Sequence, residues 1–179
     1  MKRLWDKGRQ LDDRILRYTA GEDHRLDGRL VDYDVRASIA HARMLNQQSL
    51  LSDADLDAIV TGLEALAAGH ADGQWSIGLD DEDVHTALES RLADQIGEAG
   101  KRIHLGRSRN DQVLAALRLY LLDAADRLET LADDAADALD TRAERATGTP
   151  RPGYTPPHHA RRIAMPLRAR CVAGALRGE

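Results

Sequence analysis

The chain has 179 residues, a formal net charge of -5, one cysteine and no phenylalanine. A single cysteine excludes an intrachain disulfide framework, and charges interrupt every apolar run before about 18 residues, so we expect a cytoplasmic protein without a signal peptide or membrane span. The acidic balance and the lack of interleaved basic and aromatic side chains argue against nucleic acid as the main partner.

The apolar residues predict an all-α fold. Aromatic residues make up only 3% of the chain, so the core must be built from Leu, Ala, Ile and Val. Leu and Ala favour helices, and the apolar positions recur every three or four residues instead of alternating. Taken in chain order, the expected helices cover residues 26–45, 52–68, 82–96 and 111–146.

Polar residues and glycines mark the ends of these helices. Ser52 followed by Asp55 is typical of a capping box that opens the second helix, with Asp in place of the usual Glu. Gly69 and Gly97 are the expected ends of the second and third helices, and residues 70–81 are expected to form a loop.

The helix expected over residues 111–146 is the longest, and its apolar residues recur with a period close to 3.5. At about 1.5 Å per residue it would extend about 50 Å. A domain of this size cannot bury so long a stripe, and an exposed stripe would be unusually large. We therefore expect partner helices, either from a longer chain or from other subunits.

The composition changes near residue 150. Residues 151–179 carry six arginines and one glutamate, which gives this part +5 and leaves -10 for the first 150 residues. All five prolines also lie at or after position 150. This composition favours disorder in the C-terminal part.

The segment from His104 to Gln112, with the sequence HLGRSRNDQ, carries the densest set of functional side chains. It places two guanidinium groups, a hydroxyl, an amide and a carboxylate directly before the longest helix. A helix N-terminus presents unpaired N–H groups and a partial positive charge, and arginine suits carboxylates. The segment therefore predicts a site for a small polyanionic metabolite. The alternative is an Asn-capped helix beside a solvated basic turn.

Three segments resemble the argininosuccinate lyases of the fumarase/aspartase superfamily. They are residues 4–41, which include LWDKG and DVRASIAH, residues 82–102, which begin EDVHTALESRL, and the HLGRSRNDQ segment. The resemblance implies the all-α N-terminal domain of the superfamily, followed by the first long helix of a central bundle in a homotetramer. It also implies β-elimination of argininosuccinate to arginine and fumarate, in arginine biosynthesis, without a cofactor or metal.

The resemblance assigns roles to residues of the HLGRSRNDQ segment. Ser108, Arg109 and Asn110 match the substrate-carboxylate binders of the family. Asp111 and Gln112 are expected to cap the helix and to hold the shape of the turn.

Two further assignments lie earlier in the chain. His85 matches a histidine of the family's active-site cleft, and Glu82 is expected on the same helix face, where it could hold the imidazole in one tautomer. Asp23 stands about where many relatives carry a substrate-binding serine. His41 and His104 are expected to be structural.

The resemblance changes at Thr155. This residue matches the substrate-binding threonine of the family's G-Y-T-H segment, but Pro156 replaces the histidine that takes part in proton transfer. Proline can neither donate nor accept a proton there. A short insertion could bring His159 into the site, whereas a disturbed reading frame would end the likeness at Thr155.

These features divide the chain into three expected parts. Residues 1–110 form an N-terminal lyase domain, residues 111–155 begin the long central-bundle helix region, and residues 156–179 form a divergent tail that is frameshifted or disordered. The rest of the bundle and the loop with the family's catalytic serine lie outside the likeness. We therefore expect this chain to be inactive alone.

Two other functions remain open. The residues that would recognise the leaving group are mostly absent, so the chain could belong to a lyase of the same superfamily that acts on another succinyl adduct. The chain could also be a non-catalytic helical oligomerisation fragment. If the chain belongs to an argininosuccinate lyase, its expected partners are argininosuccinate, arginine, fumarate and other copies of the chain. If it belongs to a related lyase, they are another small-molecule substrate and other copies of the chain.

Overall fold

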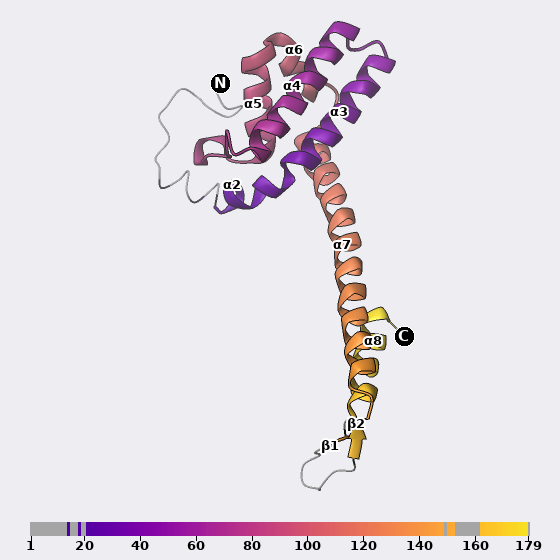
Figure 1. Cartoon of the computed structure of the whole chain (residues 1–179). Coiled ribbons are helices and arrows are strands. Elements are labelled where there is room, and N and C mark those ends of the chain that lie inside the picture. Colours follow the sequence, from indigo (N-terminus) through magenta and orange to yellow (C-terminus); the bar gives the residue numbers. More distant parts are fainter. Residues whose placement is uncertain (1–13, 15–17, 19–20, 149, 153–161, 179) are drawn as a thin grey trace. The chain divides into compact units, whose positions relative to one another are not determined.

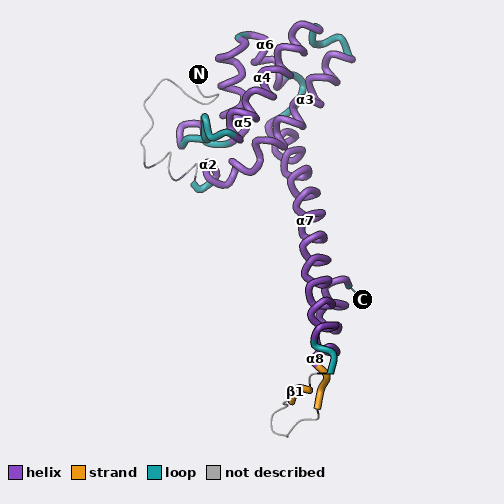
Figure 2. The backbone as a smooth tube through the Cα atoms, viewed as in Figure 1, coloured by secondary structure: helices purple, strands orange, loops and turns teal. Residues whose placement is uncertain are grey.

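The computed structural model describes residues 14, 18, 21–148, 150–152 and 162–178. Helices make up most of this part (Figures 1 and 2), which confirms the expected all-α class. None of its helices combines the length and the apolar character needed to cross a membrane. The chain divides into two compact units, Met1–Tyr120 and Leu121–Glu179.

The first unit is a small assembly of helices. α3 packs against α4 and α5, and α4 also packs against α5 and α6. The 3-10 turns of this unit are Asp27–Leu30, Leu79–Asp81 and Arg102–His104. Its helices are α2 (Asp23–Leu26), α3 (Val31–Gln47), α4 (Asp53–Ala71), α5 (Val84–Ile96), α6 (Glu98–Lys101) and the first turns of α7 (Arg109–Arg145).

The core of the first unit lies between α3, α4 and α5. Each helix contributes apolar side chains three or four residues apart, which places them on one helix face. Burying each such side chain stabilises the fold by about 1.5–3 kcal/mol. The buried core includes Val31, Val35, Ile39 and Leu45 from α3, Ile59, Leu63 and Leu66 from α4, and Val84, Leu88 and Leu92 from α5.

The helix ends agree in part with the sequence. Ser52 caps α4 by accepting the backbone N–H of Asp55 at 3.1 Å, as expected. Gly97, with a φ of 67°, follows the last residue of α5, also as expected. Gly69 does not end α4, which continues to Ala71. A Cβ at Gly69 would meet the side chains of Gln74 at 3.3 Å and Trp75 at 3.4 Å, so the following loop lies against this glycine.

The second unit contains the remainder of α7, two short strands and α8. Strands β1 (Pro150–Pro152) and β2 (Arg162–Ala164) pair antiparallel, with Arg151 opposite Ile163. α8 (Met165–Arg177) follows β2 directly. The sequence predicted that residues 156–179 are frameshifted or disordered, and disorder is wrong for Met165–Arg177, which form a helix.

Two features of α8 explain its order. Ala169 and Ala173, one helical turn apart, are both buried. Arg177 donates to Asp137 at 2.6 Å and to Asp140 at 2.9 Å, which ties the end of α8 to α7 within the second unit. These hydrogen bonds raise the pKa of Arg177 above its ordinary value. Arg177 is one of the arginines whose abundance predicted disorder, and it instead anchors α8 to α7.

Candidate active site

The HLGRSRNDQ segment forms the connection into α7. Gly106 has a φ of 72°, a left-handed conformation that glycine adopts at low cost. The Ser108 hydroxyl accepts the N–H groups of Asn110 at 3.1 Å and Asp111 at 3.4 Å. The Asp111 carboxylate accepts the N–H of Ser108 at 2.9 Å. These reciprocal bonds form a capping box, so Ser108, and not an asparagine, is the N-cap of α7.

This cap leaves polar groups available at the surface. The side chains of Ser108 and Asn110 are exposed. A hydroxyl that accepts backbone N–H groups still has its own proton to donate. The N-terminus of a long helix, with an exposed hydroxyl and an exposed amide beside it, suits an anion.

Arg109 lies half-buried at the same helix end, against α5. Its guanidinium donates to Thr86 and Glu89 on α5 and to Gln112 on its own helix, each at 3.4 Å. These distances lie at the long limit of hydrogen bonding, so each bond is weak. The ion pair with Glu89 holds the guanidinium beside the start of α7.

Arg107 reaches the interior of the first unit. It donates through Nη2 to the Ser38 hydroxyl at 3.0 Å, whereas its buried Nε has no hydrogen-bond partner in the described part of the chain. Burial lowers the pKa of the Arg107 guanidinium from its ordinary value, and Asp34 opposes this effect. The guanidinium stays charged at neutral pH. The HLGRSRNDQ segment thus brings a second, partly desolvated cation to the helix end.

A buried carboxylate, Asp34, joins α3, α5 and α7. It accepts hydrogen bonds from Nδ1 of His85 at 2.8 Å and from the hydroxyl of Ser38 at 3.2 Å. The amide of Gln112 donates to both carboxylate oxygens, at 3.0 and 3.1 Å. Asp34 is 0% exposed, His85 3% and Gln112 4%. Gln112 therefore holds the start of α7 against the core, a contact that the sequence did not predict.

The expected pairing of His85 with Glu82 is wrong. α5 begins only at Val84, and Glu82 lies before it with a φ of 68°, outside the helix. Asp83 is the N-cap, accepting the N–H of Thr86 at 2.7 Å. The partner of His85 is Asp34, 51 residues away in the sequence. Within the sequence, the only pointer to Asp34 was its place in a segment that resembles the family.

Two other histidines lie near the HLGRSRNDQ segment. His41 donates from Nε2 to the carbonyl oxygen of Leu105 at 2.9 Å, which ties this segment to α3. Burial lowers the pKa of His104 below its ordinary value; Glu89 opposes this, and Arg109 and other nearby cations add to it. His41 thus has a structural contact, as expected.

Three of the expected site residues cannot be placed. Asp23 is the first residue of α2, but its side chain lies outside the described structure. Thr155 and His159 lie outside the described residues. Within the described residues, no group of three or more His, Cys, Asp or Glu side chains is arranged to hold a metal ion.

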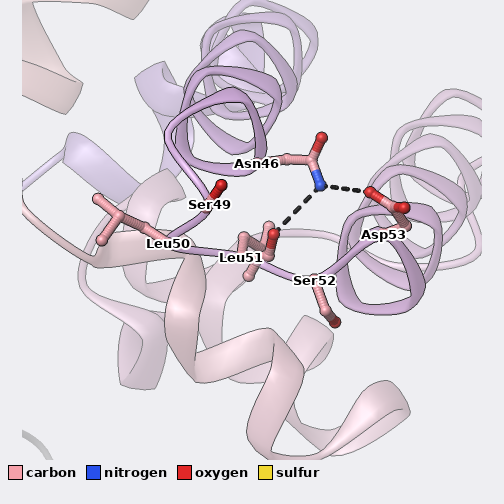
Figure 3. A pocket seen from close by; sticks show the side chains of 6 residues that line it. All are labelled: Asn46, Ser49, Leu50, Leu51, Ser52 and Asp53. Atoms are coloured by element: carbon pink, nitrogen blue, oxygen red, sulfur yellow. Dashed lines mark hydrogen bonds between the residues drawn. The ribbon is translucent and has the colours of Figure 1, made fainter.

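A surface hollow lies elsewhere, at the connection between α3 and α4 (Figure 3). Asn46 spans it, donating to the carbonyl oxygen of Leu51 at 3.1 Å and to the carboxylate of Asp53 at 2.7 Å. These bonds stabilise the connection between the two helices. None of the residues that line the hollow belongs to the HLGRSRNDQ segment or contacts Asp34.

Comparison with known proteins places these residues in a family context. The sequence model of a family described as lyase matches residues 13–179. The chain is 52% identical over 153 residues to argininosuccinate lyase of Sorangium cellulosum, covering 86% of this chain and 36% of that protein. It is 39% identical over 176 residues to argininosuccinate lyase of Thermotoga neapolitana, covering 98% of this chain and 43% of that protein.

A solved structure has a similar fold. The 3-carboxy-cis,cis-muconate lactonizing enzyme of Pseudomonas putida matches with a TM-score of 0.59 and 28% identity, over 91% of this chain and 37% of that one. The chain thus spans less than half the length of these relatives. The family match runs past Thr155, so the likeness continues beyond the point where the sequence predicted a break.

Proposed function

Because this chain belongs to the lyase family, we propose that it supplies the carboxylate-binding part of an argininosuccinate lyase active site. The observation that carries this proposal is the start of α7. There Arg109 and an exposed hydroxyl and amide surround a capped helix N-terminus, and the half-buried Arg107 adds a second positive charge. A fork-shaped guanidinium beside an exposed hydroxyl and an exposed amide, at the positive end of a helix dipole, suits a carboxylate.

The proposed reaction is a β-elimination. A base removes the proton from the carbon next to a substrate carboxylate, the carbon–nitrogen bond breaks, and an acid protonates the leaving nitrogen, which gives fumarate and arginine. Negative charge develops on that carboxylate during the reaction. Ser108, Arg109 and Asn110 bind it and stabilise this charge. Thr155, and with less support Asp23, would bind other parts of the substrate.

His85 is the proposed histidine of the cleft. Its Nδ1 faces the carboxylate of Asp34, which fixes the ring. The chain spans only 36–43% of its argininosuccinate lyase relatives, and the proposed base and acid of the reaction lie at or beyond Thr155. His159 is the weakest candidate for proton transfer. We therefore expect the chain alone to be inactive, and the complete site to need the rest of the enzyme and other subunits of a homotetramer.

A chimaera tests this proposal. Residues 1–155 of this chain replace the matching region of the Thermotoga neapolitana enzyme, so that every residue after Thr155, including the position of Pro156, is that of the enzyme. The release of fumarate from argininosuccinate is followed by its ultraviolet absorbance. We expect activity, and Arg109→Ala should lower kcat/KM by about 100-fold or more. Arg102→Ala is the control, because Arg102 forms an ion pair with Asp55 that lies at the surface.

Two results would contradict the proposal. An active chimaera that tolerates Arg109→Ala would show that the start of α7 does not bind the reacting carboxylate. Fumarate release by the unmodified chain would contradict its expected inactivity. A folded, stable oligomer that binds neither argininosuccinate nor its products would support a non-catalytic role.

A second candidate function is elimination from another polycarboxylate. The Pseudomonas putida enzyme that shares this fold is named for a carboxylated muconate, so related helices serve more than one carboxylate substrate. The start of α7 recognises a carboxylate and does not define the leaving group. A panel of succinyl adducts, tested on the same chimaera, separates the two: activity only on an adduct other than argininosuccinate would favour this candidate.

A further inference from the structure

We propose that Asp34 is a positioning residue for the HLGRSRNDQ segment. It acts through its hydrogen-bond partners and does not touch the ligand. Its role in catalysis rests on the proposed function, whereas its effect on the order of the segment can be measured without any ligand.

The first argument is the number of donors that meet on one buried carboxylate. Asp34 is 0% exposed and accepts from Ser38 on its own helix, from His85 on α5 and from Gln112 on α7. A carboxylate without such donors would be costly to bury. The position of each donor is therefore coupled to that of the carboxylate, and three helices are fixed at one point.

The second argument is the connection to both arginines. Gln112 donates its amide to Asp34, and its carbonyl oxygen accepts from Arg109 at 3.4 Å. The Ser38 hydroxyl donates to Asp34 at 3.2 Å and accepts from Arg107 at 3.0 Å. Each guanidinium of the HLGRSRNDQ segment is thus linked to Asp34 through one intermediate side chain. Loss of the carboxylate would free both intermediates to reorient.

The third argument concerns the imidazole of His85. An ionised carboxylate only accepts hydrogen bonds, so the atom 2.8 Å from it, Nδ1 of His85, must carry a proton. In the neutral ring, Nε2 is then the atom that can accept a proton. Asp34 thus selects one tautomer of His85 and also holds the start of α7.

The test uses the full chain and two substitutions. Gln112→Met keeps the side-chain volume and removes the hydrogen bonds of the Gln112 amide to Asp34 and to Arg109, but it leaves the carboxylate with His85 and Ser38. Asp34→Asn removes the charge that all three donors share. Backbone 15N relaxation reports the order of residues 108–111, and the ring 15N shifts of His85 report its tautomer. We expect order parameters to fall from about 0.85 to about 0.6 or less in both variants. The preference for the Nδ1–H tautomer should weaken only in Asp34→Asn.

A control separates positioning from simple stability. Asn46→Ala also removes two side-chain hydrogen bonds, at the α3–α4 connection (Figure 3), but none near α7. It should lower the melting temperature without changing the order of residues 108–111. Unchanged order in Gln112→Met would overturn the proposal, and this variant decides the matter if Asp34→Asn does not fold.

Fumarate, titrated into the same samples, distinguishes this proposal from the proposed function. If the unmodified chain binds fumarate, both variants should bind it about tenfold more weakly, the effect of about 1.4 kcal/mol. If the unmodified chain does not bind fumarate but the order of residues 108–111 still falls in the variants, Asp34 keeps its positioning role and carboxylate binding at this site is contradicted. Equal fumarate affinity in the unmodified chain and both variants would contradict a role of Asp34 in ligand binding.

Discussion

At the residue scale, the backbone at Glu82 is strained directly before the helix that carries His85. Its φ is 68° and its ψ is -58°, and the N–H of Asp83 donates to the carbonyl of Asp81 at 2.9 Å. This is the rare γ-turn with positive φ. Such a conformation costs a residue with a Cβ on the order of 1–3 kcal/mol. The strain sets the direction in which the chain enters α5.

We expect Glu82→Gly to be more stable than Glu82→Ala by about 1 kcal/mol. Both substitutions remove the same atoms beyond Cβ, so each is the control for the other, and only glycine relieves the steric strain. The free energy of unfolding in urea measures the difference. Equal stability, or a more stable alanine variant, would show that the turn is not strained.

The capping residues show which features can be predicted from neighbouring residues in the sequence. Ser52 was predicted as an N-cap because the capping box is encoded within four consecutive residues. The partner of His85 was not predicted correctly, because Asp34 and His85 are 51 residues apart and meet only after α3 and α5 pack. Glu82, by contrast, had the right spacing, but its backbone leaves the helix. The family resemblance pointed to the histidine, and sequence spacing could not identify its carboxylate partner.

At the element scale, the contact between α5 and α6 depends on one small residue. A Cβ at Gly100 would lie 2.8 Å from the backbone of Ala93 and 2.9 Å from that of Leu92. Backbone atoms cannot rotate away as a flexible side chain can. The two helices can therefore remain in contact only if position 100 has no side chain.

We expect Gly100→Ala to lower the free energy of unfolding by about 1–3 kcal/mol, the range for overpacking. Gly78→Ala is the matched control, because its φ of -91° is ordinary and the nearest atom to its added Cβ lies 3.6 Å away. It should change stability by about 0.5 kcal/mol or less. If thermal unfolding shows similar losses for both variants, the close approach of α5 and α6 does not limit position 100.

The helices were predicted with unequal accuracy for a physical reason. α7 was expected over residues 111–146 and spans Arg109–Arg145, because its apolar stripe continues without interruption. The first predicted helix was placed at 26–45, whereas α3 starts at Val31 and is preceded by α2 and a 3-10 turn. Turns this short contain too few residues to show a periodic pattern of apolar side chains. α8 was missed because prolines and arginines determined the prediction, while its buried alanines gave a weak hydrophobic pattern.

At the scale of the whole molecule, the second unit exposes a row of large apolar side chains. Leu121 is 54% exposed, Leu122 62%, Leu128 67% and Leu131 52%. Isolated exposed leucines are ordinary, but several on one helix form a patch of the kind that marks an interaction site. The periodic stripe read from the sequence is therefore still uncovered on α7. The chain spans less than half the length of its relatives. Helices from the remainder of such a protein are candidates to cover this stripe.

We expect the chain to self-associate through this stripe, with a fraction of oligomer in sedimentation velocity that grows with concentration. The combined substitution Leu128→Gln and Leu131→Gln should shift the distribution towards monomer, because it removes apolar area while keeping helix propensity. Glu129→Gln lies between them on the exposed surface and is the control, which should leave association unchanged. If the unmodified chain stays monomeric at high concentration, α7 is stable without partner helices, and the length of its stripe does not by itself require other subunits.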